Sequence, residues 1–281
     1  MIVLLLAEIT VCIQPCIKNY KENIMKKYFA VINGSTGGIG SAIAKHMANH
    51  FNLILLGRDK KSLQNLSEEI KNIIPDTIVQ YYMVDMLEPK TLAIAALAIE
   101  QQNIAIRALV NSVGVVPVGS LLDVDDKQWG DTFQIGFMSA VHLIKNFTPL
   151  MQKDGGSIVI VNGVLAIQPE ANFIISSSVT GALRNFAKAI SKDLSRYRIR
   201  VNTILPGGTL TSLWHEITYE LGKKLNLTAD ELSQNIASNN PLRRLAEPSD
   251  IAHAANFLCS EAAAYINGAF LTIDGGGSLA M

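Results

Sequence analysis

Short apolar runs alternate along this chain with longer stretches whose apolar residues recur at helical spacing. The first such unit joins the run at 28–33 to an amphipathic stretch at 38–50. Short buried strands separated by helices need crossover connections, so they pair in a parallel sheet that is covered by helices on both faces. The alternation therefore predicts a single-domain α/β fold with a doubly wound parallel sheet, the Rossmann arrangement.

Later units continue the same pattern. Expected strands lie at 53–56, 78–84, 108–112, 157–161, 199–205 and 270–273, and expected helices lie at 60–73, 89–102, 125–151, 171–196 and 248–260. Two further helices, at 213–224 and 228–238, interrupt the alternation after the sixth strand. An insertion at the ligand edge of such a sheet is suited to cover a substrate. We therefore expect a small helical lid at about 207–245, with a small-molecule ligand in the cleft beneath it.

The composition supports a large core and limits the classes of partner. Hydrophobic residues make up 49% of the 281 residues and charged residues 17%, which excludes overall disorder. Lys+Arg and Asp+Glu both number 24, so no net charge draws the chain to nucleic acid or to an anionic membrane. Three cysteines are too few for a disulfide framework. We expect a cytoplasmic protein that binds neither nucleic acid nor membrane.

The first 25 residues are expected to lie outside the fold. No Lys or Arg precedes the apolar run at 2–7, and the run is far shorter than a membrane span of about 20 residues. Cys12 and Cys16 have no other Cys or His nearby in sequence, so we expect no metal site. Met25 is a natural start just before the first strand. The folded domain is therefore expected to span residues 26–281.

A glycine-rich turn follows the first expected strand and opens the first helix, with Gly34, Gly38 and Gly40 at G-x-x-x-G-x-G spacing. Glycines allow a tight turn and a close approach of the backbone to a pyrophosphate. The helix N-terminus adds free N–H groups and a partial positive charge. The turn therefore predicts a dinucleotide site. The residues expected to form it are Gly34, Ser35, Thr36, Gly38, Ile39 and Gly40.

The end of the second expected strand bears on which dinucleotide binds. An acidic residue at this position holds the ribose 2′-hydroxyl in NAD-preferring folds. This chain has Gly57 followed by Arg58, and a guanidinium suits bidentate pairing with a 2′-phosphate. We therefore expect NADP(H) in preference to NAD(H), with Asp59 as the group that could still reach the ribose.

Taken together, these motifs resemble those of the short-chain dehydrogenase/reductase family over about residues 26–277. The segment 33–40 resembles the T-G-x-x-x-G-x-G turn, with Asn33 in place of Thr. The segment 111–114 resembles the N-N-A-G motif. The stretch 200–211 resembles R-V-N…P-G…T beside the nicotinamide, and 273–276 resembles the closing D-G-G.

The resemblance implies a larger cofactor set and an assembly. Asp85 occupies the position of the family Asp that contacts the adenine. Members of the family usually associate through the two long helices, here 125–151 and 171–196, and through the last strand, which implies a homodimer or homotetramer. The further cofactor contacts that the resemblance implies are Asn111, Gly114, Pro206, Gly207, Thr209 and Thr211.

The chain departs from the family at the catalytic group, which consists of an Asn, a Ser and a Tyr-x-x-x-Lys pair. Counted from the neighbouring motifs, these positions fall on Gly136, Gly163, Ser176 and Thr180. A second register places Phe173 at the Tyr position. No Tyr lies between Tyr82 and Tyr197, and no Lys lies between Lys153 and Lys188. The pair is therefore missing in any register.

An aliphatic hydroxyl such as that of Ser176 is a poor substitute for the missing phenol. A phenol has a pKa of about 10 that a nearby cation lowers, whereas a serine hydroxyl starts several units higher. Loss of one acid–base group removes roughly 10²–10⁴-fold in rate. His215, beside Trp214 in the expected lid, is the remaining acid–base candidate.

Three functional hypotheses follow. The first is an NADP(H)-binding pseudoenzyme that acts as a sensor, regulator or partner subunit, and intact cofactor motifs beside an emptied catalytic group favour it. The second is an active NAD(P)-dependent oxidoreductase that uses another proton donor or reduces an activated C=C bond, such as that of an enone. The third is a scaffold that has lost the cofactor as well, which Asn33, Ser112 and Val113 suggest because they depart from the family pattern.

Overall fold

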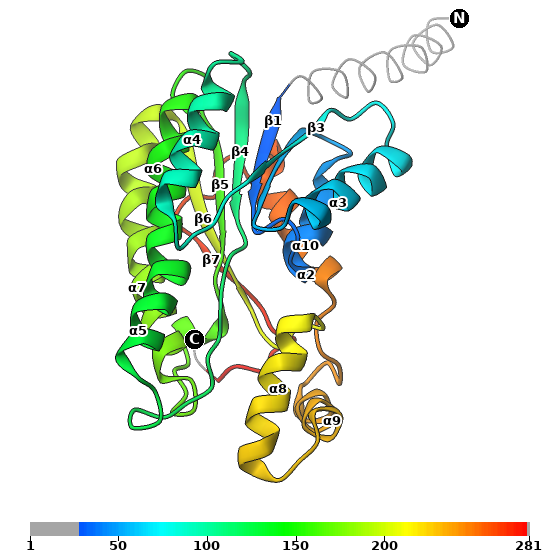
Figure 1. The fold of residues 1–281 in the computed structure, drawn as a ribbon, viewed down its shortest axis with the longest axis vertical. Helices are drawn as coiled ribbons and strands as arrows, with labels where there is room; N and C mark the ends of the chain where they lie inside the picture. Colours follow the sequence, from blue (N-terminus) through cyan, green and yellow to red (C-terminus); the bar gives the residue numbers. More distant parts are fainter. Residues whose placement is uncertain (1–27, 280–281) are drawn as a thin grey trace, which may run out of the picture.

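The computed structural model describes residues 28–279, so the predictions made for residues 1–25, Cys12 and Cys16 included, lie outside the described residues. Over this range a sheet lies between two layers of helices (Figure 1). Its strands are β1 (Phe29–Asn33), β2 (Asn52–Gly57), β3 (Val79–Met83), β4 (Ile106–Asn111), β5 (Gly156–Val161), β6 (Ile199–Pro206) and β7 (Phe270–Ile273). The helices are α2 (Gly38–Met47), α3 (Lys60–Ile73), α4 (Pro89–Glu100), α5 (Asp126–Phe133), α6 (Ser139–Met151), α7 (Ile174–Asp193), α8 (Ser212–Leu225), α9 (Ala229–Asn239) and α10 (Pro248–Cys259).

The strands are parallel and lie in the order β3-β2-β1-β4-β5-β6-β7. The order reverses between β1 and β4, where Asn33 and Asn111, the last residues of the two strands, lie opposite each other. In such sheets a ligand binds outside the carboxyl ends of the strands at this switch point. The predicted doubly wound parallel sheet is confirmed, and its topology places the glycine turn at the switch point.

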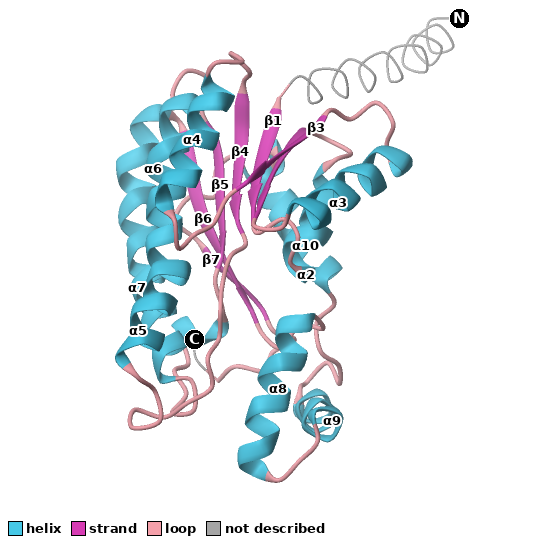
Figure 2. Cartoon of the chain, viewed as in Figure 1, coloured by secondary structure: helices cyan, strands magenta, loops and turns pink. Residues whose placement is uncertain are grey.

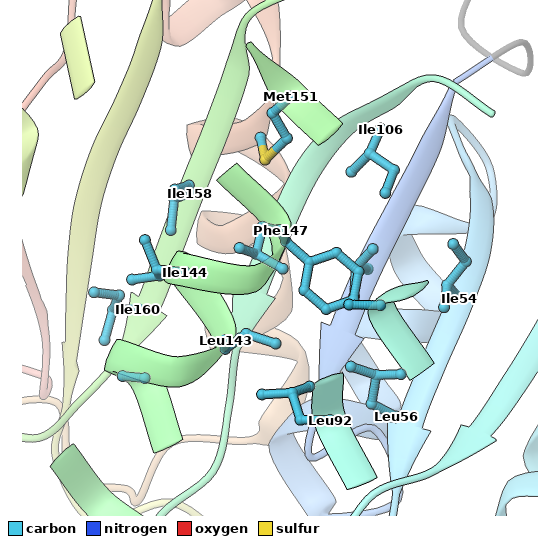
Figure 3. Packing of buried hydrophobic residues seen from close by; sticks show 14 of the residues in the cluster. Ile54, Leu56, Leu92, Ile106, Leu143, Ile144, Phe147, Met151, Ile158 and Ile160 are labelled. Atoms are coloured by element: carbon cyan, nitrogen blue, oxygen red, sulfur yellow. The ribbon is translucent and has the colours of Figure 1, made fainter. Parts of the chain in front are cut away.

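Each face of the sheet carries its own core. Helices α4, α6 and α7 cover one face, and α2, α3 and α10 cover the other (Figure 2). Every residue of β1 and β2 is buried, which explains why these strands appear in the sequence as continuous apolar runs without polar alternation. Figure 3 shows Phe147 of α6 packed among Ile54, Leu56 and Ile106 of the sheet.

Most predicted elements are present, and two of them, α3 and β7, have the predicted bounds. The helix predicted at 171–196 begins only at Ile174, because residues 171–173 form a turn that pairs with Gly119, whose N donates a hydrogen bond to Asn172 O at 2.7 Å. The helix predicted at 125–151 is continuous but contains a π-helical turn at Gln134–Met138. No helix within residues 28–279 is long and apolar enough to cross a membrane.

The two lid helices lie at the carboxyl edge of the sheet, below it in Figure 1. Thr211 caps α8, since its Oγ1 accepts from Trp214 N at 3.1 Å, and Thr228 caps α9 through a capping box with Glu231. The indole Nε1 of Trp214 donates to Ser233 Oγ at 3.1 Å and joins the two helices. The helix pair predicted after the sixth strand is therefore present.

We expect Phe147→Ala to lower the free energy of unfolding by about 3–5 kcal/mol, because it leaves a cavity where a fully buried ring packs the sheet against α6. Denaturant unfolding of the two proteins measures the difference. Leu122→Ala is the control, since Leu122 is 95% exposed, and it should leave the midpoint unchanged. Equal midpoints for all three proteins contradict this account of the core.

Candidate functional site

A cavity of about 300 Å³ lies over the switch point. It is walled by the carboxyl ends of β1, β2 and β4 and by the segments that follow them. Val84, Met86 and Ile135, which the sequence analysis did not single out, give it an apolar lining together with Val113. The predicted cofactor residues that line this first cavity are Gly34, Thr36, Arg58, Asp85 and Gly114.

Close backbone approach explains the spacing of the glycines. Gly34 has φ +72°, and a Cβ there would lie 2.6 Å from the carbonyl oxygen of Ser112. A Cβ on Gly40 would meet the carbonyl oxygen of Gly34, and one on Gly38 would lie 2.5 Å from Thr211 Cγ2. A side chain at Gly34 would separate the turn from the segment after β4. A side chain at Gly40 would separate the helix from the turn, and one at Gly38 would separate the helix from the start of the lid.

The N-terminus of α2 is free to receive an anion. Its N-cap is Gly37, which has no side chain to accept from the first N–H groups, and no acidic residue lies in its first turn. Uncapped N–H groups and the helix dipole favour negative charge at this end. The added Cβ of Gly114 would meet nothing within 4 Å, so the opposite wall is open. The arrangement fits a dinucleotide pyrophosphate.

Four of the predicted cofactor residues line neither this cavity nor the one described below: Ser35, Gly38, Gly40 and Asn111. Ser35 is buried, and its Oγ donates to Leu56 O at 3.0 Å. Asn33 Nδ2 donates to Asn111 Oδ1 at 2.9 Å, which ties the ends of β1 and β4 together beneath the turn. Ser35 and Asn111 are therefore buried beneath the turn, whereas Gly38 packs against Thr211 and Gly40 against the backbone of Gly34.

The end of β2 presents a cation and no carboxylate to the cavity. Gly57 and Arg58 both line it, Arg58 is exposed, and its guanidinium has no ion-pair partner within residues 28–279. Asp59 instead caps α3, where its Oδ2 accepts from Ser62 N at 2.7 Å. The hydrogen bonds from Ser62 lower the pKa of Asp59. Arg58 is thus the charged group available at this end.

A second cavity, of about 260 Å³, lies between the end of β5 and the lid helix α8. The predicted cofactor residues that line it are Ile39, Pro206, Gly207, Thr209 and Thr211. The expected lid contributes Leu213, Trp214 and Ile217, and the alternative Tyr position contributes Phe173. The sequence analysis did not single out Val116, Asn162, Val164 and Leu165, which also line it. Asn162 could have been found, because it directly follows β5 at the edge where ligands bind. His215 is exposed and does not line the cavity.

The positions of the missing Asn and Ser differ in the space around them. Gly163 lines the second cavity, and a Cβ there would meet nothing within 4 Å. Gly136 is buried in the π-helical turn, and a Cβ there would lie 2.7 Å from Val179 Cγ1. A larger side chain therefore fits at Gly163, whereas at Gly136 it would clash with Val179.

The hydroxyls at the Tyr and Lys positions do not reach either cavity. Ser176 is 2% exposed, and its Oγ makes no hydrogen bond within residues 28–279. Thr180 Oγ1 donates to the carbonyl oxygen of Ser176 at 2.7 Å, one turn earlier in α7. Phe173, at the Tyr position of the alternative register, does line the second cavity. No residue that lines this cavity in the described part of the chain is ionisable.

One ion pair joins the lid to the loop after β4. Lys224, near the end of α8, lies 2.7 Å from Asp123 Oδ2. The hydrogen bond from Lys224, together with bonds from Ser120, lowers the pKa of Asp123 to about 2. The same loop carries Val113 and Val116, which line the first and second cavities. The pair therefore links the lid to a wall that both cavities share.

Comparisons with known proteins agree with this geometry. A family model described as enoyl-(acyl carrier protein) reductase matches residues 34–278. The NADPH-dependent reductase BacG of Bacillus subtilis (strain 168) is 32% identical over 257 residues, which are 90% of this chain and 98% of BacG. The structure of L-sorbose reductase from Gluconobacter frateurii, complexed with NADPH and L-sorbose, gives a TM-score of 0.85 at 28% identity and covers 92% of this chain and 98% of that one.

A second solved structure is also similar over most of the chain. An NADPH-bound short chain oxidoreductase from Pseudomonas aeruginosa PAO1, described as containing an atypical catalytic center, gives a TM-score of 0.82 at 25% identity. The match covers 92% of this chain and 99% of that one.

We expect Lys224→Met to loosen the lid. Amide hydrogen exchange should become roughly two- to fivefold faster in α8 (residues 212–225) and in the loop after β4 (residues 112–125). This is the effect expected from losing an exposed ion pair. Because the pKa of Asp123 is lowered in the folded state, the pair contributes above the unfolded value of about 4 and is lost only as the pH falls through about 2. The difference should therefore be the same at pH 5 and at pH 7.

Lys223→Met is the matched control, since Lys223 pairs with Glu220 of the same helix. Exchange that accelerates equally in both variants contradicts a specific link between the lid and the loop.

Proposed function

Because the chain belongs to the short-chain dehydrogenase/reductase family, we propose that it is an NADPH-dependent reductase whose substrate is an activated C=C bond. The observation that carries this proposal is the second cavity, which adjoins the glycine turn and is lined without any ionisable side chain. NADP(H) is the cofactor that the sequence favours. Of the three hypotheses, we prefer the active oxidoreductase to the pseudoenzyme.

The residues of the first cavity fit NADPH. The uncapped start of α2 and the Gly34 turn would hold the pyrophosphate, Arg58 the 2′-phosphate and Asp85 the adenine side. Pro206 and Thr211 border the second cavity, where the nicotinamide and the substrate would meet. Two relatives support this assignment, since BacG is named NADPH-dependent and L-sorbose reductase is complexed with NADPH. When bound, NADPH would supply a hydride.

The lining of the second cavity decides between substrate classes. Reduction of a ketone places a negative charge on one oxygen atom, which needs a positioned acid, and such an acid contributes roughly 10²–10⁴-fold. Thr209 and Thr211 are no such acids, since their hydroxyls donate to backbone oxygens. Addition at the carbon of an enone or enoyl group spreads the charge over a conjugated system, and water can then protonate the carbon. An unsaturated carbonyl compound is therefore the substrate class that these residues can serve.

The chain contributes an apolar enclosure to this reaction. Leu213, Trp214 and Ile217 of α8 close one side of the second cavity, and Val164 and Leu165 close the other. A volume of about 260 Å³ fits a small unsaturated ketone or the reacting end of a longer acyl chain. The family model described as an enoyl-(acyl carrier protein) reductase supports this choice.

A ligand-sensing pseudoenzyme is the second candidate, and the surroundings of Gly136 favour it. Val179 occupies the space that a side chain at Gly136 would need. The hydroxyl of Thr180 donates a hydrogen bond to the backbone oxygen of Ser176. In this candidate NADPH would bind without turnover.

We also propose a homodimer or homotetramer, with contacts through α5–α6, α7 and β7, as the family resemblance implies. Phe133 of α5 is 38% exposed and Leu271 of β7 is 37% exposed, which gives both surfaces an apolar residue for such contacts.

Arg58→Gln should weaken NADPH binding roughly 10- to 100-fold, the effect of losing a charge-assisted hydrogen bond to a phosphate. NADH affinity should stay within twofold, because NADH has no 2′-phosphate, and this makes NADH the internal control. Titration of each protein with both cofactors, followed by nicotinamide fluorescence, measures the change. Parallel loss for NADPH and NADH would show that Arg58 has no role in the discrimination.

With NADPH, we expect turnover of small enones and enoyl thioesters and at least 10²-fold less with the matching saturated ketones. Ser176→Ala should leave the enone rate within twofold, since Ser176 is buried away from the cavity. The rate should also be flat between pH 6 and pH 9, because no ionisable group lines the site. The assay follows NADPH absorbance and identifies the product.

A loss of 10²-fold or more in Ser176→Ala would instead make Ser176 the acid. Tight NADPH binding with no turnover of either class would support the sensor.

A further inference from the structure

A third cavity, larger than the two at the carboxyl edge, lies at the opposite edge of the sheet, and the proposed function does not use it. Its volume is about 970 Å³. Tyr28, Arg107, Gly156 and Ile199 line it, and they precede or begin β1, β4, β5 and β6. The segment 259–267, which follows α10, forms the other wall. In Figure 1 this edge is at the top of the sheet, and the lid is at the bottom.

Three guanidinium groups line this cavity, together with one carboxylate. The cations are Arg107, Arg198 and Arg200, and Glu261 is the carboxylate. Among the described residues no other Asp or Glu and no Lys lines it. Because the whole chain has a formal net charge of zero, the positive charge here is a local concentration. Charge of one sign in a cleft concentrates ions of the opposite sign.

Arg200 is half-buried and has no carboxylate partner within residues 28–279. Its Nη1 donates to Ile266 O and its Nη2 to Ser260 O, both at 3.2 Å. Burial lowers the pKa of Arg200, so its charge is poorly solvated. The two neutral carbonyl groups compensate only part of the cost of burying this charge. An anion in the cavity would stabilise the guanidinium further.

The other two guanidinium groups have donors to spare. Arg198 donates from one nitrogen to Lys153 O at 2.9 Å, and its backbone is held at φ +59°. Arg107 packs over the ring of Tyr28 at 5.1 Å, and its only carboxylate among the described residues, at 3.3 Å, is that of Glu261. The Glu261 side chain is 80% exposed, so this pair is weak. Both cations can therefore turn to a bound oxyanion.

Much of the remaining wall is apolar or aromatic, and Ser195, Ser260 and Asn267 are the polar residues in it. Phe51, Ile199, Ala262 and Tyr265 line it, and Tyr265 is fully exposed at the rim. The volume is at the upper end of the range of about 300–1,000 Å³ that ligand pockets occupy. An aromatic or acyl body fits these walls, and its charged end fits the guanidinium groups.

We propose that this cavity is a second ligand site, which binds an amphipathic organic oxyanion: a carboxylate, sulfonate or phosphate carried on an aromatic or acyl body. Arg107 and Arg198 bind the oxyanion beside Arg200, and Glu261 competes with it for Arg107. The site does not depend on the proposed reductase activity, because it shares no lining residue with the two cavities at the carboxyl edge.

The test uses anilinonaphthalene sulfonate, a fluorescent aromatic sulfonate, with the full chain in saturating NADPH so that the first cavity is blocked. Arg107→Gln and Arg198→Gln should each weaken sulfonate binding roughly 5- to 20-fold, the effect of losing one partly exposed charged hydrogen bond. Glu261→Gln should tighten it roughly two- to fivefold, since it frees Arg107. Arg200 is left unchanged, because it holds two backbone carbonyls.

Two controls distinguish recognition of the sulfonate charge from non-specific hydrophobic binding of the probe. Arg196→Gln changes a nearby arginine that pairs with Asp193 and does not line the cavity, so binding should not change. Uncharged N-phenylnaphthylamine, which lacks the sulfonate, should bind more weakly and respond to none of the variants. Opposite effects of the Arg and Glu variants cannot come from misfolding.

The proposal is overturned if sulfonate affinity is the same in all the variants, if the uncharged probe binds equally well, or if the full chain shows no saturable sulfonate binding. A circular dichroism melt of each variant confirms that it is folded.

Discussion

The contact between the glycine turn and the backbone that follows β4 is the constraint on which the carboxyl edge of this molecule depends. Gly34 approaches Ser112 so closely that a single Cβ would separate β1 from β4. The Asn33–Asn111 hydrogen bond holds the same two strands from below. This packing directs the uncapped N-terminus of α2 into the first cavity and brings Thr211 over Gly38, so the cofactor end and the lid end of the site are positioned together.

The second cavity and the cavity at the amino edge of the sheet differ in the charge of their linings. At the carboxyl edge the second cavity has no ionisable lining residue, and its few hydroxyls donate to backbone oxygens. At the amino edge three guanidinium groups and one carboxylate line the third cavity. A balanced composition conceals this separation, because net charge is a sum over the chain and a site depends on local charge. The reaction site is thus suited to apolar substrates and the far cavity to anions.

The residues at the four positions expected for the catalytic group differ in their surroundings. Gly136 lies against Val179, and Thr180 donates to the backbone one turn earlier. Only Gly163 has open space around it. Restoring one polar side chain therefore does not restore the missing acid–base group. A substrate that needs no positioned acid is compatible with all of these positions at once.

The sequence alone determined the strand–helix alternation, the glycine turn, Arg58 at the end of β2, the lid helices and the absence of a Tyr–Lys pair, because each of these depends on local spacing or on residue identity. Sequence could not show that Ser35 and Asn111 are buried beneath the turn, that Asp59 caps α3, or that His215 does not line the second cavity. The sequence also did not predict the π-helical turn at Gly136 or the cavity that Arg107, Arg198 and Arg200 line together. These features arise where segments distant in the chain meet, so only tertiary packing decides which side chains share a cavity and which are buried against a neighbour.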